Sequence, residues 1–168
     1  MNIFALDRDP VTAARWLCDK HISKMVVESG QMLANIFTPQ ELTTAPLTKA
    51  GTVWRHSHFN HPCSKWVRES RANAIWLCIH ATTMENERIE RGFKPHFSLG
   101  FILWCLENLP RDRFPRHDLT DFAVAINPEQ SCRRHPDFTA ADTVGKYRLY
   151  YKCDKPFATW KRNKPEWF

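Results

Sequence analysis

The stretch Trp16-Leu-Cys-Asp-Lys-His-Ile-Ser-Lys-Met-Val-Val-Glu28 decides the fold, because it lies inside the longest helix that the sequence predicts. Asp9 is a suitable N-cap, Pro10 suits the first helical position, and the next proline is Pro39. We therefore expect one helix from Pro10 to shortly before Pro39. At 3.6 residues per turn, one apolar stripe forms from Cys18, Ile22, Met25, Ser29, Met32, Leu33 and Ile36. A glycine in a helix interior is about 1 kcal/mol less favourable than an alanine. The presence of Gly30 within the predicted helix therefore favours a close packing contact at that position.

A second stripe of the same helix carries ionisable side chains at the edge of the buried face. It is formed by Leu17, His21, Lys24, Glu28 and Gln31. Partial burial shifts histidine and lysine pKa values, and a neighbouring carboxylate tunes them, so the stripe is typical of an active-site wall. Cys18 and Lys20 flank it and are further candidates. The alternative is a solvated helix face with an ordinary Lys24–Glu28 pair one turn apart.

Length and composition indicate a single compact domain over residues 1–168. The chain has 43% hydrophobic residues, 7 Trp and 11 Phe, which is enough for a substantial core. No apolar run approaches the roughly 20 residues of a membrane span. The N-terminus also lacks the succession of basic, apolar and small residues that a signal peptide has. We therefore expect a soluble intracellular protein with no membrane partner. Its six cysteines contain no CxxC pair, which favours free thiols over a disulfide framework.

The net charge of +6 is concentrated near the C-terminus. Residues 143–168 hold seven basic and two acidic residues, so this segment carries +5 of the total, and it is also rich in aromatic rings. Basic residues interleaved with aromatics can neutralise phosphates and stack bases, which predicts DNA binding by segment 139–168. The candidates are Lys146, Tyr147, Arg148, Tyr151, Lys152, Trp160 and Lys161. The alternative is a segment whose aromatic residues dock on the core.

The remaining sequence predicts further helices separated by irregular segments, and strand patterns are scarce. A second helix runs from Pro62 to about Arg91, either unbroken or with a new segment capped by Ser70. The other expected elements are a helix over 98–109, a helix from 140 to about 152 capped by Thr139 or Asp137, long loops over 38–60 and 110–138, and an extended or short strand segment over 2–6. The fold class is therefore mainly α, with at most a short N-terminal strand.

The segment from Arg55 to Cys63 concentrates possible ligands. His56, His58 and His61 lie within eight positions of one another and of Cys63, but their spacing matches no standard structural zinc module. We therefore predict no metal here. The histidines are instead candidates for phosphate or base contacts, or His61 or Asn60 caps the next helix. Arg68, farther along that helix, is a phosphate-contact candidate or the partner of a surface ion pair.

Several common catalytic signatures are missing. The sequence has no GxGxxG, no GxxxxGK[ST], no HExxH, no GxSxG and no zinc deaminase pattern. No cofactor is therefore predicted. Any catalysis must come from scattered side chains that the fold brings together.

Three stretches together resemble the phage amino acid:DNA transferases, also called the thymidine aminotransferase family. They are Asn2-Ile-Phe-Ala-Leu-Asp7-x-Asp9-Pro10 with Cys18-Asp-Lys-His-x-x-Lys-Met25, then Asn60-His-Pro62 with Trp66-Val-Arg-Glu-Ser70, and Lys146-Tyr-Arg-x-Tyr-Tyr151 with Trp160-Lys161 and Pro165-x-Trp167-Phe168. The resemblance covers both ends and the first half, and it is weak across 38–54 and 92–135.

The resemblance implies a step in thymidine hypermodification in the cytoplasm of an infected bacterial host. The partners would be DNA containing 5-phosphomethyl-deoxyuridine and a free amino acid, glycine in some members, which replaces the phosphate. The oligomeric state stays open.

The implied chemistry assigns roles to the candidate residues. Either a Cys18 thiolate adds to the pyrimidine ring, or the amine displaces the phosphate directly. Lys20, Lys24 and Arg68 would hold the phosphate, and His21 or Glu28 would take a proton. Residues that would hold the amino acid or the extruded base are Asp19, His58, Asn60, His61, Tyr147, Tyr151 and Trp160.

Two other functions are compatible with the same residues. The first is a DNA glycosylase of the pyrimidine-dimer type, in which Lys20 or Lys24 is the amine nucleophile and Glu28 the carboxylate. The second is a non-catalytic DNA-binding or host-interaction protein, in which the polar stripe is a docking face.

Overall fold

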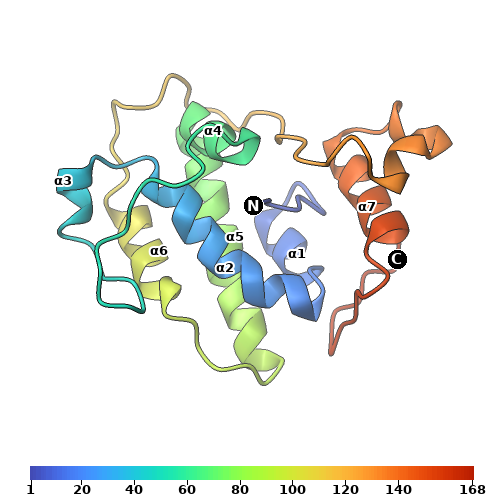
Figure 1. Cartoon of the computed structure of the whole chain (residues 1–168), viewed down its shortest axis with the longest axis horizontal. Helices are drawn as coiled ribbons and strands as arrows, with labels where there is room; N and C mark the ends of the chain where they lie inside the picture. The colour runs from blue at the N-terminus through green and yellow to red at the C-terminus, as the bar shows by residue number, and fades with distance from the viewer.

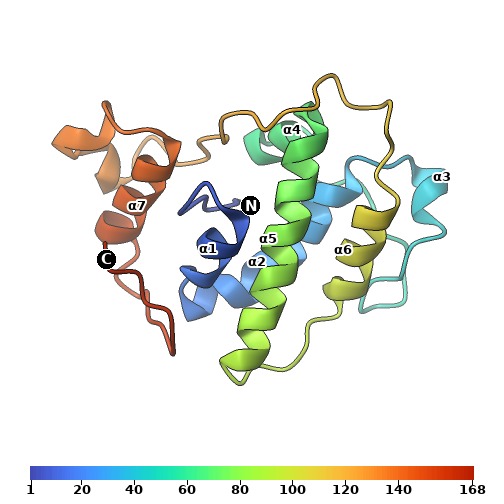
Figure 2. The same cartoon turned by 180° about the vertical axis from the view of Figure 1, so that it is seen from behind.

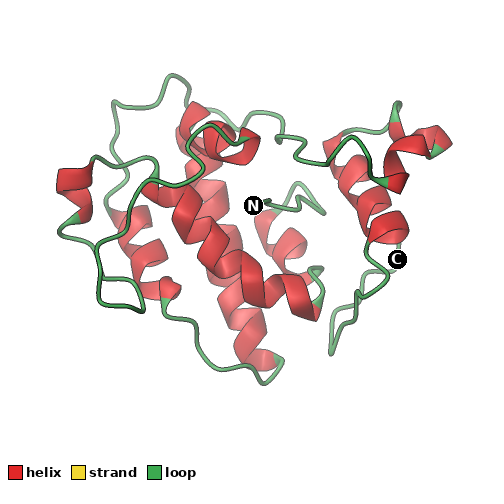
Figure 3. Cartoon of the chain, viewed as in Figure 1, coloured by secondary structure: helices red, strands yellow, loops and turns green.

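The computed structural model describes all residues from 1 to 168 and contains helices but no strand (Figure 3). The helices are α1 (Pro10–Arg15), α2 (Asp19–Ala34), α3 (Pro39–Leu42), α4 (Pro62–Glu69), α5 (Arg71–Glu90), α6 (Ser98–Glu107) and α7 (Thr143–Asp154), with 3-10 turns at Ser131–Arg134 and Pro136–Phe138. The prediction of a mainly α fold is confirmed, and residues 2–6 are extended without strand pairing. None of the helices combines the length and the apolar character that crossing a membrane requires.

Helix α5 is the centre of the packing, and α1, α2, α4 and α6 all contact it. Figure 1 shows α2 crossing in front of α5, and Figure 2 shows α5 from behind. In both views the N-terminal segment and α1 lie between these helices and α7. One cluster of 41 buried residues runs through all of these elements, from Ile3 to Tyr151. The N-terminal segment is therefore enclosed by helices from both ends of the chain.

The prediction of one unbroken helix from Pro10 to near Pro39 is wrong, because the chain breaks between α1 and α2. Arg91, whose side chain is fully buried, donates hydrogen bonds to the carbonyl oxygens of Arg15 and Leu17, at 2.8 Å each. The indole of Trp160 donates to the carbonyl oxygen of Trp16 at 2.8 Å. These distant donors satisfy carbonyl groups that a continuous helix would have paired internally.

The other helix boundaries also differ from the simplest expectation. Ser70 does cap a separate segment, because its hydroxyl accepts from the amide of Ala72, so the alternative with a break is the correct one. Helix α7 starts at Thr143 rather than 140, because Asp142 is its N-cap and accepts from the amide of Gly145 at 2.8 Å. The loop over 38–60 contains the short helix α3, which a capping box at its start stabilises.

Gly30 makes the close contact that its position in a helix favours. A Cβ atom at this position would lie 3.0 Å from the Trp54 ring. Trp54 is held in place by stacking on Phe101, with ring centroids 4.2 Å apart, and by a hydrogen bond to the carbonyl oxygen of Pro46. The loop that follows α3 is therefore anchored on α2 at Gly30.

Candidate active site

The ionisable stripe of α2 forms one wall of a cavity of about 340 Å³. The N-terminal segment, the segment around Ala125 and the end of α7 complete it. Its lining residues are Met1, Asn2, Phe4, Lys20, His21, Lys24, Met25, Glu28, Ala125, Asn127, Tyr150, Lys155 and Phe157. Four of the five predicted catalytic residues therefore lie in one cavity, namely Lys20, His21, Lys24 and Glu28.

Glu28 is the acidic centre of the cavity. Its side chain is only 10% exposed, yet both carboxylate oxygens have partners. Lys24 Nζ lies 3.2 Å from one oxygen. The other oxygen accepts from the backbone amide of Asn2 at 3.0 Å and lies 3.8 Å from the amino group of Met1. A carboxylate held between two amines is organised for proton exchange and for stabilising positive charge.

His21 lines the same cavity, and buried contacts hold its ring in place. Its Nδ1 atom is 2.5 Å from the Tyr151 hydroxyl, and its ring stacks on Phe4 with centroids 4.3 Å apart. Burial, together with the charges of Lys155 and Lys24, lowers the pKa of His21 to about 3. His21 is thus neutral and weakly basic at pH 7, so Glu28 is the stronger candidate for a proton acceptor.

Two more cations and an exposed ring surround the opening. Lys20 Nζ lies 4.4 Å from the centroid of the Phe157 ring, which is 41% exposed. Lys155 Nζ lies 3.7 Å from the centroid of Tyr150. The cavity thus has three lysines against one carboxylate, and such a site attracts a phosphate-bearing ligand.

Cys18 and Asp19 lie outside this cavity. Cys18 is fully buried at the start of α2, and burial raises the pKa of its thiol, which disfavours the thiolate that nucleophilic attack requires. Asp19 pairs with Arg91 at 2.9 Å and accepts from the amide of Lys161. Both residues support the junction between α1 and α2.

The predicted contacts in the loop before α4 are also outside the cavity. His61 caps α4 by accepting from the amide of Cys63, as one of the alternatives predicted. Arg68 packs 3.3 Å from the centroid of Phe59 and donates to the Phe59 carbonyl oxygen. His58 and Asn60 are exposed. The structure brings no group of three or more His, Cys, Asp or Glu side chains together in metal-binding geometry.

Most of the C-terminal aromatic residues dock on the core. Tyr147 and Tyr151 are fully buried, and the Tyr147 hydroxyl donates to the carbonyl oxygen of Ala123. Arg148 donates to the Leu6 carbonyl oxygen and pairs with Asp7, while Trp160 is half-buried. Of the basic residues predicted to contact DNA, Lys152 and Lys161 are exposed and Lys146 is half-buried. The buried rings are not available to stack on an extruded base.

Sequence reasoning missed the cavity residues that lie outside α2, among them Met1, Asn2, Lys155 and Phe157. Met1 and Asn2 reach Glu28 only because α7 and the segment near Ala125 hold the N-terminal segment in place. The Asn2 amide group donates to the Ala125 carbonyl oxygen at 2.9 Å. No local pattern indicates such a contact, which joins residues 123 positions apart.

Comparison with known proteins identifies the family. The profile of the family described as pyrimidine dimer DNA glycosylase matches residues 1–99, more than half of the chain. The chain belongs to this family. The match includes α1, α2 and the Glu28 carboxylate. No curated protein and no solved structure gives a match.

Membership of the pyrimidine dimer DNA glycosylase family confirms the broader expectation of an enzyme family that acts on DNA. It does not extend to amino acid transfer, which the resemblance to phage transferases implied. The matched segment ends before α7, so residues 100–168, with Lys155 and Phe157, lie outside it.

Proposed function

We propose that this protein is a DNA glycosylase that removes a damaged pyrimidine, of the dimer type, with an amine nucleophile held against Glu28. The observation that carries the proposal is the pair of amines, from Met1 and Lys24, on the two oxygens of one largely buried carboxylate. Family membership supports the class of substrate.

The proposed step starts when an amine in contact with Glu28 transfers a proton to the carboxylate and becomes nucleophilic. The neutral nitrogen attacks C1′ of the target nucleotide, and the bond from C1′ to the base breaks. The base leaves with the bonding electrons and takes the proton from Glu28, and opening of the sugar ring leaves an iminium between C1′ and the nitrogen. Two amines fit this role, namely the side chain of Lys24 and the amino group of Met1.

Glu28 has a second role once the base has left. After it passes its proton to the departing base, the restored carboxylate stabilises the positive charge of the iminium. Because the Glu28 side chain is only 10% exposed, water screens this interaction weakly.

The rim of the cavity suits an extruded nucleotide. Lys20 and Lys155 provide positive charge for the flanking phosphates. Phe157, 41% exposed at the opening, offers a ring on which a base can stack once it has left the duplex.

Mass spectrometry of ultraviolet-irradiated DNA incubated with the protein tests this proposal. We expect loss of the glycosidic bond at pyrimidine dimers, at least about 100-fold slower with Glu28→Gln. Glu107→Gln, at an exposed site on α6, is the matched control and should match the wild type. Unchanged DNA would contradict the proposal and leave amino acid transfer or non-catalytic DNA binding as the alternatives.

Amino acid transfer to 5-phosphomethyl-deoxyuridine is the second candidate, and the three lysines of the cavity favour it. A phosphate monoester carries a charge of about −1.5 to −2 at pH 7, and Lys20, Lys24, Lys155 and the Met1 amino group against Glu28 leave a net +3. In that reaction the amino acid nitrogen bonds to the methylene carbon while phosphate leaves with the C–O electrons. The same mass spectrometry on phosphomethylated DNA with each amino acid would detect the new nucleoside.

A further inference from the structure

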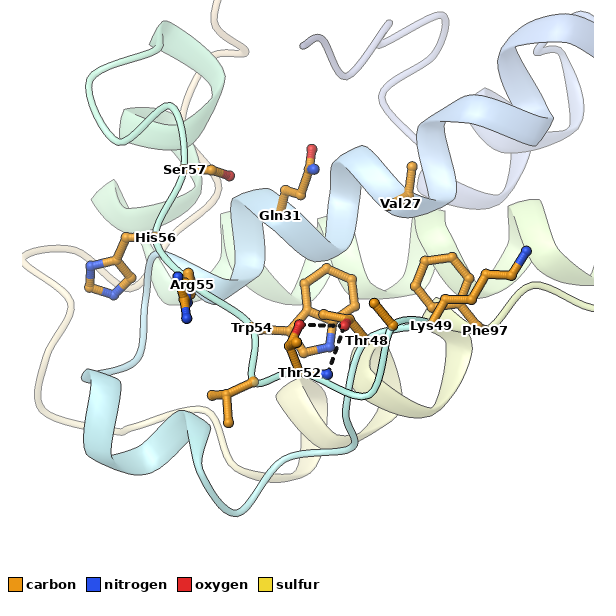
Figure 4. Close-up of a pocket in the computed structure, with 12 residues that line it drawn as sticks. Val27, Gln31, Thr48, Lys49, Thr52, Trp54, Arg55, His56, Ser57 and Phe97 are labelled. Atoms are coloured by element: carbon orange, nitrogen blue, oxygen red, sulfur yellow. Dashed lines mark hydrogen bonds between the residues drawn. The ribbon is translucent and has the colours of Figure 1, made fainter.

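A second cavity lies beside the first along α2. It has a volume of about 520 Å³ and lies between α2 and the loop over 48–57, with Phe97 at one end. Figure 4 shows Lys49 and Phe97 at one end of this groove, Trp54 in the middle, and Arg55 and His56 at the other end.

The linings of the two cavities overlap on one side of α2. Lys20 and Lys24 line the first cavity, whereas Val27 and Gln31 line the second. At about 100° per residue, these four side chains fall within about 60° of one another around the helix. Lys24 and Gln31 are seven residues apart, which is about 10 Å along the axis at about 1.5 Å per residue. A DNA strand that advances about 3.4 Å per nucleotide covers that distance in about three nucleotides.

The second groove is positively charged and holds no counter-charge. No acidic side chain lines it. Lys49 and Arg55 take part in none of the ion pairs of the structure, unlike Arg113 and Arg116, which pair with glutamates. Two free cations at opposite ends of a groove match the repeating negative charge of a phosphodiester backbone.

The loop that carries these cations is held in shape by its own contacts. The Thr48 hydroxyl lies 2.8 Å from that of Thr52, and the Thr48 amide donates to the Thr52 carbonyl oxygen at 2.8 Å. Gly51 occupies the left-handed region at φ +74°, which closes the turn. Trp54, farther along the loop, packs its ring against Gly30 of α2 and so holds the loop on that helix. A preorganised loop loses little conformational entropy on binding.

We propose that this groove binds the DNA strand that leaves the first cavity, with Lys49 and Arg55 on backbone phosphates of the segment that begins about three nucleotides from the target. The proposal rests on the proposed action on DNA and extends it to a second subsite. It places part of the DNA path on α2 and the loop over 48–57, in addition to the predicted C-terminal segment. Phe97, 40% exposed, provides a ring for a flanking base.

The test measures affinity for a 30-base-pair duplex against salt concentration by fluorescence anisotropy. The double variant Lys49→Ala/Arg55→Ala should lower the slope of log K against log salt by about 1.8, because each lost phosphate contact removes about 0.9. Arg111→Ala/Arg134→Ala removes the same charge from two exposed sites outside both cavities and should leave the slope within about 0.3 of the wild type.

Two outcomes would overturn the proposal, namely an unchanged slope in the groove variant or an equal loss in the control variant. Because the slope reports binding alone, it remains informative even if no base is released. A second measurement uses a tetranucleotide with the pyrimidine dimer at its centre, which is too short to reach the groove. On this substrate the groove variant should react at the wild-type rate, whereas Glu28→Gln should not.

Discussion

The Nδ1 atom of His21 on α2 lies 2.5 Å from the hydroxyl oxygen of Tyr151 on α7. Both side chains are buried, and Phe4 of the N-terminal segment stacks on the His21 ring. This hydrogen bond joins elements 130 positions apart and fixes α7 against α2. The base of the cavity beside Glu28 therefore depends on a contact between the two ends of the chain.

Tyr151→Phe should destabilise the fold without weakening DNA binding directly. The substitution leaves a buried histidine nitrogen without its partner, which costs about 1–3 kcal/mol. Urea denaturation measures this loss. Tyr150→Phe is the matched control, since the Tyr150 hydroxyl has no hydrogen bond within the protein, and it should cost less than about 0.5 kcal/mol. Equal stability of the Tyr151→Phe variant and the wild type would contradict the assigned role.

Stability should fall as the pH is lowered from 7 to 5. Burial lowers the pKa values of His21 and His80 to about 3, from an ordinary 6.5. Between these values the unfolded chain binds protons that the folded protein does not, so folding weakens as the pH falls. Each histidine should contribute a loss of about 2 kcal/mol by pH 5, where most carboxyl groups remain ionised. Urea denaturation at several pH values should show His21→Gln and His80→Leu each reducing this dependence by about 2 kcal/mol. A wild-type stability that is constant across this range would refute the assignment.

Arg91→Met should destabilise the protein severely, because Arg91 replaces the helical hydrogen bonds lost between α1 and α2. Its buried guanidinium also pairs with Asp19 and Glu87. Removing one member of a buried charged network costs about 3–5 kcal/mol. Arg8→Met, which breaks an exposed pair with Asp121, should cost less than about 1 kcal/mol. Similar unfolding midpoints for the two variants would show that the junction does not depend on Arg91.

Gly30→Ala should lower the stability of the protein, because the packing cost at Trp54 should exceed the gain in helix propensity. Alanine favours a helix by about 1 kcal/mol over glycine. Its Cβ would lie 3.0 Å from a Trp54 ring that Phe101 and the Pro46 carbonyl oxygen hold in place. Such overpacking costs about 1–3 kcal/mol, so we expect a net loss of up to about 2 kcal/mol in thermal unfolding. A more stable variant would mean that the loop over 48–57 is free to move.

The sequence predicts the ionisable wall of the cavity because all its members lie on one helix. The spacing of His21, Lys24 and Glu28 places them on successive turns, and it remains valid although the predicted helix is broken before Asp19. The break itself is not predictable locally, since its hydrogen-bond donors come from Arg91 and Trp160, both more than 70 positions away.

Composition alone is a poor guide to the C-terminal segment. Tyr147 and Tyr151 have the residue types of a base-stacking surface, yet both are fully buried, because α7 needs an apolar face to cover the N-terminal segment. The local pattern of this helix does not distinguish a ring that contacts the core from one that contacts DNA. The exposed ring at the cavity is Phe157, beyond the end of α7.

Borohydride trapping on DNA that contains pyrimidine dimers tests the central role of the Glu28 cavity most directly. The account predicts a covalent adduct between protein and DNA whose mapped peptide contains Met1 or Lys24, formed at least about 100-fold more slowly with Glu28→Gln. An adduct on a residue outside the cavity, or one formed at the wild-type rate by the Glu28→Gln variant, would contradict it.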